Sequence, residues 1–354
     1  MVAPWFPSSV NPGAGSFIAR DVMALQKEHE VRVVHLIEPK YDAGDHRTTC
    51  GKADVFRVPM LKNKPLQVLN AAKEIRKLSR GADVIHSMAV TSLIPIRFMA
   101  SLSAPLVHTE HYTGVTRARS PKLAAGYFSV YQRPKVISSV STFLADAVTR
   151  LSKRESRVIP NIVDSDGYIE PRKPDGKLRL LSIGGLVPKK DPLMAVRTLA
   201  ELRSRGYEAE LSWAGMGPME DELVKLAQEL GIRNQLKLLG QINHKQVIEQ
   251  IADSDLILHT STVETFSLVA AETLISGRPL VIQSVGGHRD FAVGPYAQFP
   301  AERSPEAFAD AVEKAFSARE GQDWVGNSKE LQSRFSEESF LQSWNRIYRE
   351  VSGN

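Results

Sequence analysis

Two glutamates, Glu264 and Glu272, stand eight positions apart in the segment ETFSLVAAE. The first is expected in a loop after a short buried strand, and the second about two turns into an apolar helix. Thr265, Phe266 and Ser267 then place backbone N–H groups at the helix start, where a phosphate is favoured by the unpaired donors and by the helix dipole. The plain alternative is a capping carboxylate followed by a surface glutamate. Glu272 falls among apolar neighbours, where an unpartnered carboxylate is costly, and this favours a binding role for the pair.

Such a site needs elements that bring several loops together, and the chain supplies them twice. Short β-branched runs alternate with helical stretches, a pattern typical of a parallel sheet covered on both faces. In the first half the expected strands are 31–37, 84–87, 106–109 and 135–139, and the expected helices are 16–28, 65–80, 91–101 and 142–151. In the second half the expected strands are 178–183, 210–214, 236–238, 255–259 and 280–282, and the expected helices are 192–204, 219–230, 245–251, 268–276, 305–318 and 337–351.

This pattern predicts an α/β protein of two facing Rossmann-like domains. We expect one domain at 1–160, a second at 161–335 and a C-terminal helix at 336–354 that could cross back to the first domain. The segment 170–176, EPRKPDG, has the composition of a linker. Open parallel sheets bind ligands at the carboxyl ends of their strands, so the sequence predicts a site in the cleft between the domains.

The composition limits the class of protein. The 354 residues are 42% hydrophobic and 24% charged, which is ordinary for a soluble globular chain. Cys50, the single cysteine, cannot form an internal disulfide, and its surroundings, Thr48, Thr49 and Gly51, predict a polar loop. The N-terminus has no basic start followed by an apolar run, and no stretch is long and apolar enough to span a bilayer. We therefore expect a cytoplasmic protein.

The net charge of +5 conceals an asymmetry between the halves. Residues 1–165 carry 23 Lys+Arg and 13 Asp+Glu, a net +10, which leaves −5 for residues 166–354. A basic first half predicts an anionic partner. Zinc-finger spacing and ribonucleoprotein motifs do not accompany this charge, so we expect no nucleic acid and favour the inner face of an anionic membrane or a phosphate-bearing acceptor. The basic stretch 61–80 is either a solvated helix face or a membrane contact.

Other polar residues have plainer interpretations to weigh. A histidine such as His111, at a strand end, is often only a satisfied polar group, but its place at the carboxyl end of a parallel strand favours an active-site role. We expect His108 to be structural. The Asp-x-Asp triplets at 164–166 and 253–255 could hold a divalent metal, but turn and capping chemistry accounts for them, and we expect no metal site. The GMGP segment at 215–218 is accounted for by a tight strand-to-helix turn.

The segment 264–272, with GRPLVI at 277–282 and VGG at 285–287 downstream, resembles the E-x7-E region of glycosyltransferase group 1 (family 4, retaining). The resemblance covers nearly the whole chain through blocks at 13–15, 105–111, 159–161, 183–190 and 215–217. It implies the GT-B architecture, with an acceptor domain followed by a nucleotide-sugar domain. It also implies transfer of a sugar, with retention of configuration, from a nucleotide diphosphate sugar to a glycan, lipid-linked or small-molecule acceptor in polysaccharide or glycoconjugate synthesis.

The resemblance implies roles for individual residues. His111 would orient the sugar, Glu264 would stabilise the reacting centre, and Lys190 would hold the departing diphosphate. Glu272 would bind the ribose hydroxyls. The other donor-binding residues would be Gly15, Gly185, Lys189, Gly240, Gln241, Ile242, Thr265, Phe266 and Ser267. Lysine and backbone amides would meet the diphosphate charge, so the resemblance implies no metal and no cofactor besides the donor.

The chain departs from the family pattern at several positions. Gly185 stands where the family usually has arginine, and Lys189 could substitute for it. Asp290 takes the acidic place of the block at 286–290, NIVD at 161–164 replaces the usual Asn-Gly-Val-Asp, and the first strand is short, at 2–3. Two other functions remain open. A nucleotide-sugar epimerase uses the same architecture without an acceptor, and a two-domain sugar-binding protein would normally carry a signal peptide and gives no reason for the paired glutamates.

Overall fold

The computed structural model describes residues 1–118, 120–173 and 175–353, which form two compact units. The first unit comprises Met1–Ile162 and Phe335–Asn354, and the second comprises Val163–Arg334. The chain passes from the first unit to the second after Ile162 and returns to the first unit after Arg334. Pro174, within the expected linker 170–176, and Asn354, at the end of the expected final segment, lie outside the described residues.

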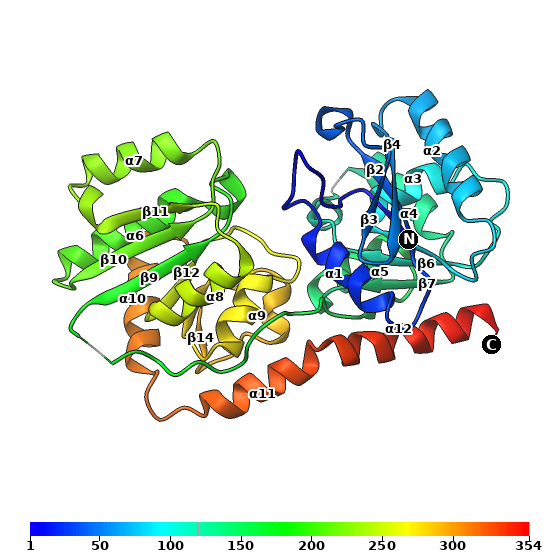
Figure 1. Ribbon diagram of the computed structural model, residues 1–354. Helices are drawn as coiled ribbons and strands as arrows, with labels where there is room; N and C mark the ends of the chain where they lie inside the picture. Colours follow the sequence, from blue (N-terminus) through cyan, green and yellow to red (C-terminus); the bar gives the residue numbers. More distant parts are fainter. Residues whose placement is uncertain (119, 174, 354) are drawn as a thin grey trace. The chain divides into compact units, whose positions relative to one another are not determined.

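An eight-stranded sheet forms the centre of the first unit, in the order β3-β4-β2-β1-β5-β6-β7-β8 (Figure 1). Neighbouring strands run parallel except β3 and β4, which pair antiparallel at one edge. Strands β2, β5, β6 and β7 are almost entirely buried, as expected for a parallel sheet covered on both faces. The strands are β1 Val2–Ala3, β2 Arg32–Ile37, β3 Arg47–Cys50, β4 Ala53–Pro59, β5 Ile85–Met88, β6 Leu106–Glu110, β7 Val136–Ser139 and β8 Arg157–Val158.

Helices pack against this sheet in two groups. Helix α2 contacts α3, α3 contacts α4 and α4 contacts α5, while α1 contacts the C-terminal helix α12. Helix α12 buries Phe340, Trp344 and Ile347 in a core shared with the first unit's sheet, which is why the end of the chain belongs to that unit. The helices are α1 Ser16–Leu25, α2 Pro65–Leu78, α3 Ala89–Ile96, α4 Pro121–Tyr131, α5 Thr142–Ser152 and α12 Glu337–Ser352, with short 3-10 turns at Pro39–Tyr41 and Thr113–Arg117.

The second unit is built on a six-stranded, wholly parallel sheet in the order β11-β10-β9-β12-β13-β14 (Figure 1). Its core gathers leucines of β9 and β10 with Trp213, Phe308 and the inner face of α6. The strands are β9 Leu178–Ile183, β10 Ala209–Ala214, β11 Leu236–Gly240, β12 Leu256–His259, β13 Leu280–Ile282 and β14 Ala297–Gln298. The helices are α6 Pro192–Ser204, α7 Glu220–Glu229, α8 His244–Asp253, α9 Leu268–Ile275, α10 Pro305–Ser317 and α11 Trp324–Arg334.

The prediction of two Rossmann-like domains with parallel sheets is confirmed. The predictions of individual elements were incomplete. The stretch 47–59 forms the β3–β4 hairpin, so the expectation that Cys50 lies in a loop was wrong: Cys50 ends β3, and its Sγ lies 4.0 Å from the carbonyl of Ala19. Helices α4 and α11 were not predicted either. Their apolar periodicity is weak, and Gly126 and Gly326 interrupt it.

Candidate active site

Glu264 lies at the centre of a cluster of charged groups in the second unit. Its Oε1 accepts from Lys190 Nζ at 2.5 Å and lies 3.2 Å from His259 Nε2, while its Oε2 lies 3.8 Å from Lys189 Nζ. The Glu264 side chain is only 10% exposed. Burial alone would raise its pKa, but the Lys190 charge, followed by His259 and Lys189, holds the pKa well below its usual value. Glu264 is therefore a carboxylate.

His259 is a neutral partner of that carboxylate. It ends β12 and is buried, and burial lowers its pKa despite the neighbouring Glu264. A carboxylate oxygen can only accept, so His259 Nε2 carries the hydrogen and donates it to Glu264. The sequence analysis did not single out His259, although its position at the carboxyl end of a parallel strand is the signal that directed attention to His111.

Backbone contacts fix the two lysines against the Glu264 loop. Lys189 and Lys190 lie in the 3-10 turn Pro188–Lys190, and Asp191 follows as the N-cap of α6, where its side chain accepts from the N–H of Met194. Thr260 Oγ1 donates to the carbonyls of Lys190 and Asp191. Thr262 N–H donates to the carbonyl of Lys189 at 2.9 Å. The loop after β12 is thus attached to the turn after β9.

Glycines make the close packing at this edge possible. Gly286 has φ 143°, pairs with Glu264 in a parallel bridge, and would place a Cβ 2.5 Å from the Glu264 carbonyl oxygen. Gly215 has φ 136°, and its Cβ would lie 2.1 Å from the carbonyl oxygen of Gly184. Gly185 carries no such constraint, since its Cβ would meet only ordinary contacts. Glycine is therefore required at 215 and 286 by backbone packing alone.

Glu272 lies on α9 with its side chain 7% exposed. His244, the first residue of α8, has its Nδ1 3.8 Å from Glu272 Oε1 and its Nε2 3.7 Å from Asp164 Oδ2. His244 follows the loop of Gly240, Gln241 and Ile242. It begins α8, and Asn243 and Gln246 form a capping box at the N-terminus of this helix. The residue that follows the 240–242 loop at the start of α8 thus lies next to Glu272. His244 is a second residue that the sequence analysis missed.

The remaining predicted donor residues of the second unit lie at the start of α9. Ser267 is its N-cap, with φ 75°, and its side chain accepts from the N–H of Ala270. Thr265 and Phe266 precede it, and Phe266 is buried against Phe291 at 5.2 Å between ring centroids. The predicted residues thus follow the carboxyl ends of β9, β11 and β12, three parallel strands of one sheet, and such sheets bind ligands at that edge.

His111 lies at the corresponding edge of the first unit, directly after β6. Its ring packs 4.8 Å from that of Phe17, on the first turn of α1. Burial lowers its pKa to about 3, so the imidazole is neutral. Within the described residues its buried Nε2 has no hydrogen-bond partner. A buried polar atom without a partner is rare, and this one is suited to a ligand hydroxyl.

Glu110 holds the His111 backbone in place. Its Oε1 accepts from the N–H groups of His111 at 3.0 Å and Tyr112 at 2.7 Å, and its Oε2 accepts from the Tyr131 hydroxyl and lies 3.3 Å from His108 Nε2. Burial alone would raise the pKa of Glu110, but the hydrogen bonds from His108, Tyr131 and Tyr112 hold it below its usual value. His108 is fully buried and supports this carboxylate. Glu110 was also missed.

Gly15 caps α1 at the same edge, with φ 65°. A Cβ there would lie 2.5 Å from the carbonyl group of Trp5, so the packing of the β1–α1 loop requires glycine. This contact accounts for Gly15 without a ligand, and its predicted place beside the diphosphate stays a prediction.

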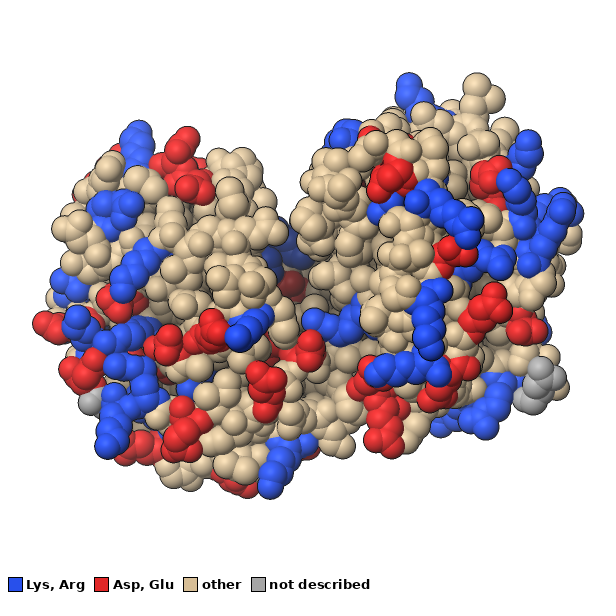
Figure 2. Space-filling model, in the orientation of Figure 1, with Lys and Arg blue, Asp and Glu red and all other residues tan. Residues whose placement is uncertain are grey.

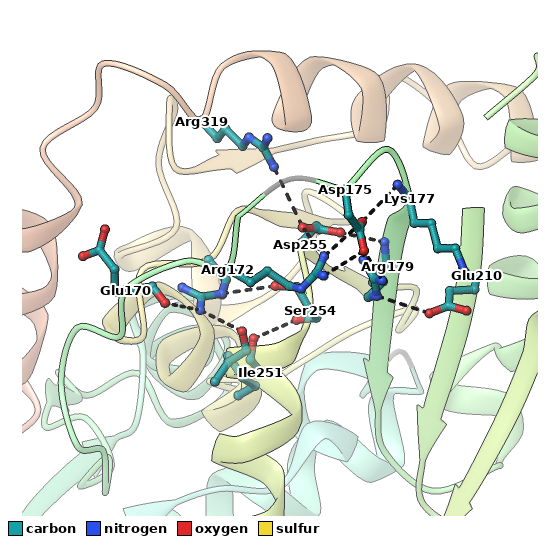
Figure 3. Close-up of polar contacts among 12 residues, drawn as sticks. Glu170, Arg172, Asp175, Lys177, Arg179, Glu210, Ile251, Ser254, Asp255 and Arg319 are labelled. Carbon is teal, nitrogen blue, oxygen red and sulfur yellow. Dashed lines mark hydrogen bonds and ion pairs between the residues drawn. The ribbon is translucent and has the colours of Figure 1, made fainter. Parts of the chain in front are cut away.

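The Asp-x-Asp triplets are engaged by basic groups. Asp255 Oδ2 accepts from the backbone N–H of Arg179 at 2.9 Å, and Oδ1 lies 3.9 Å from Arg172 and 4.0 Å from Arg319 (Figure 3). Asp164 faces His244. Across 1–118, 120–173 and 175–353, the side chains of His, Cys, Asp and Glu are nowhere gathered in threes that could hold a metal ion.

Comparisons with known proteins identify the family. Residues 13–166 match the family model described as Glycosyltransferase Family 4, and residues 169–338 match that of Glycosyl transferases group 1. The chain is 26% identical to an uncharacterized glycosyltransferase of Methanocaldococcus jannaschii over 49% of this chain and 45% of that protein. It is also 26% identical to glycogen synthase of Mycobacterium tuberculosis over 62% of this chain and 57% of the synthase. These matches span about half the length of the curated relatives.

The fold is similar to that of solved structures over nearly the full length. The crystal structure of Anabaena Alr3699/HepE in complex with UDP-glucose aligns with a TM-score of 0.76 at 17% identity, covering 99% of each chain. With both halves matched by family models in the order that the sequence blocks predict, the chain belongs to the group 1, family 4 glycosyltransferases.

Proposed function

We propose that this chain is a retaining glycosyltransferase that moves a sugar from a nucleotide diphosphate sugar to an acceptor hydroxyl. The observation that carries the proposal is the Glu264 carboxylate held between Lys190, Lys189 and His259 at the carboxyl edge of the second unit's sheet. The two lysines supply positive charge that stabilises a diphosphate. The ionised, buried glutamate supplies negative charge that stabilises a sugar centre as it becomes positive.

In this reaction the bond between the anomeric carbon and the diphosphate oxygen breaks, and its electron pair stays on the phosphate. Lys190 and Lys189 stabilise that charge, and Lys190 keeps its contact with Glu264. The acceptor oxygen bonds to the anomeric carbon on the face that the leaving group vacates, which retains configuration. The acceptor proton passes to the departing phosphate. Glu264 stabilises the cationic sugar, so none of the steps needs a metal.

Glu272 and His111 have separate roles toward the donor. Glu272 accepts hydrogen bonds from the ribose hydroxyls, beside His244 and the 240–242 loop that would receive the base. His111, neutral and with its Nε2 unpaired among the described residues, bonds to a sugar hydroxyl. Because Glu110 fixes its backbone, the His111 ring is positioned before the ligand binds.

The donor and acceptor classes are part of the proposal. The UDP-glucose complex of the Anabaena protein supports uridine diphosphate sugars as the first donors to test. The acceptor would be a glycan, a lipid-linked sugar or a small molecule. An epimerase of the same fold would act on the donor alone, so dependence of sugar transfer on an added acceptor separates the two functions.

Donor binding can be tested without knowing the acceptor. Titration calorimetry with a panel of nucleoside diphosphates and their sugars should find at least one that binds, and that ligand should also raise the stability of the folded state. Glu272→Gln should weaken that binding about tenfold or more, since charged acceptors make the stronger hydrogen bonds. Glu229→Gln, on the exposed end of α7, is the matched control. Equal affinity in the wild type and Glu272→Gln would remove Glu272 from the donor site.

A further inference from the structure

Helix α2 carries an exposed face that the proposed reaction does not use. Its inner side packs on β2, β4 and α3 through Val68, Ala71, Ala72 and Ile75. The spacing i, i+3, i+4, i+7 places these four on one stripe, so the opposite stripe points away from the unit's core. Leu66 and Leu69 lie on this outer stripe and are 82% and 53% exposed. Leucines with more than half of their surface exposed contribute little to the unit's core.

Basic residues surround the two leucines. The segment 61–80 contains six lysines and arginines and a single acidic residue, Glu74. The six basic residues are all exposed: Lys62, Lys64, Lys73, Arg76, Lys77 and Arg80. Glu74 is half-buried and lies 3.7 Å from Lys77. In Figure 2, blue basic groups gather at the right-hand edge of the molecule, where Figure 1 draws α2. We call Leu66, Leu69 and these six residues the α2 surface.

We propose that the α2 surface binds an anionic lipid bilayer in the plane of the headgroups. A helix that combines exposed apolar side chains with lysine and arginine has the composition of an interfacial helix: its leucines enter the acyl boundary and its cations meet lipid phosphates. None of the described helices is long and apolar enough to cross a membrane. A soluble polyanion would need only the basic residues, so the exposed leucines favour a lipid bilayer over such a partner.

Vesicle sedimentation with the whole chain tests the proposal. The wild type should bind vesicles of equal parts phosphatidylcholine and phosphatidylglycerol, but not vesicles of phosphatidylcholine alone. Sodium chloride at about 0.5 M should weaken the binding, because salt screens exposed charges. Equal binding to both vesicle types at low salt, or no binding to either, would overturn the proposal.

Two sets of substitutions locate the surface. Reversal of Lys73, Arg76 and Lys77 to Glu should weaken binding at least about a hundredfold, since each cation at an anionic membrane contributes roughly a fivefold factor. The control reverses three exposed lysines of the second unit, Lys225, Lys314 and Lys329, and so alters net charge equally. It should bind like the wild type. If both triple variants lose binding alike, the effect is net charge and the α2 surface is rejected.

The leucines distinguish a bilayer from a soluble polyanion. Leu66→Ser with Leu69→Ser keeps every charge and should weaken vesicle binding about tenfold, since insertion of exposed leucine stabilises interfacial helices. The same variant should elute from a heparin column with the wild type. Leu230→Ser with Val325→Ser is the control for exposed apolar residues elsewhere. Wild-type vesicle affinity in the α2 leucine variant would show that the surface binds polyanions through charge alone, and would overturn the membrane proposal.

Discussion

The Nε2 atom of His259 lies 3.2 Å from Oε1 of Glu264, the same oxygen that accepts the ion pair from Lys190. One carboxylate oxygen therefore contacts two donor groups, one at the end of β12 and one in the turn after β9. With Lys190 and His259 both on Oε1, the side chain of Glu264 has a defined orientation at the edge of the sheet.

His259 should accordingly be a positioning residue for Glu264. His259→Leu removes the N–H donor, and turnover of the nucleotide sugar should fall about tenfold to a hundredfold with little change in KM, because a small displacement of a reacting group is costly. His259→Gln carries an amide N–H of similar reach and should recover part of the loss. Steady-state kinetics of the two folded variants check this. If the Leu variant turns over like the wild type, His259 has no such role.

Lys190 should couple the stability of the second unit to pH. Lys190→Met leaves the buried Glu264 without its main cation, so the free energy of unfolding at pH 7 should fall by about 2 kcal/mol. In the wild type the lowered pKa of Glu264 contributes stability above its ordinary value of 4.5, and that contribution is lost as the pH falls further. In the variant, burial raises the pKa of Glu264, so the deficit should shrink as the pH approaches 4.5.

Urea unfolding of both proteins at pH 7 and near pH 4.5 measures this difference. Lys225→Met, which removes an exposed lysine of α7, is the control and should show a small effect that does not depend on pH. A deficit of Lys190→Met that is the same at both pH values would contradict the assignment of the ion pair.

Gly286→Ala should disturb the site through the backbone. Its φ of 143° and a Cβ 2.5 Å from the Glu264 carbonyl force the Glu264 loop to move. Gly231→Ala is the matched control, since Gly231 also has a positive φ, 68°, but a Cβ there meets nothing within 4 Å among the described residues. Gly231→Ala should lose about 1 kcal/mol of stability from backbone strain. Gly286→Ala should lose more, because its Cβ also meets the backbone of Glu264. Only Gly286→Ala should also reduce turnover, and equal turnover in the two would contradict the packing argument.

Sugar transfer should not require a divalent metal, because the proposed site meets the diphosphate with Lys189 and Lys190. Activity in excess EDTA should match activity without it. Complete loss with EDTA that manganese or magnesium restores would instead point to a metal held by the donor and the carboxylates of the chain.

The sequence predicted the elements whose apolar patterns are strong, and missed those whose patterns are weak. Buried strands such as β9 and β12 are near-continuous apolar runs, so they were located well. The β3 strand reads Arg-Thr-Thr-Cys and alternates only weakly, because it lies at the exposed antiparallel edge. Helix α3 begins at Ala89, with φ 56°, rather than at 91, and Pro95 lies inside it. Neither feature follows from periodicity.

The site shows a similar division. Glu264, Glu272 and Lys190 were proposed from the sequence because their residue types and spacing match the family pattern. Glu110, His244 and His259 could not be proposed in this way, because their importance depends on which partners the fold brings to them. Glu110 gathers N–H groups from residues next to it and a hydroxyl from α4, and α4 itself was not predicted. The ionisation state of Glu264 likewise depends on its contact with Lys190, and that of His111 depends on burial. A single sequence quantifies neither of them.

The most direct test of the central claim compares Glu264→Gln with the wild type on one donor. Using the nucleotide sugar that binds most tightly by calorimetry, and with water taking the place of the acceptor, release of nucleoside diphosphate by hydrolysis should be measurable for the wild-type chain. Glu264→Gln should lower that release about a hundredfold or more while changing donor affinity less than about tenfold, because the carboxylate acts on charge that develops only in the transition state. Release of nucleoside diphosphate by Glu264→Gln at the wild-type rate would contradict the account.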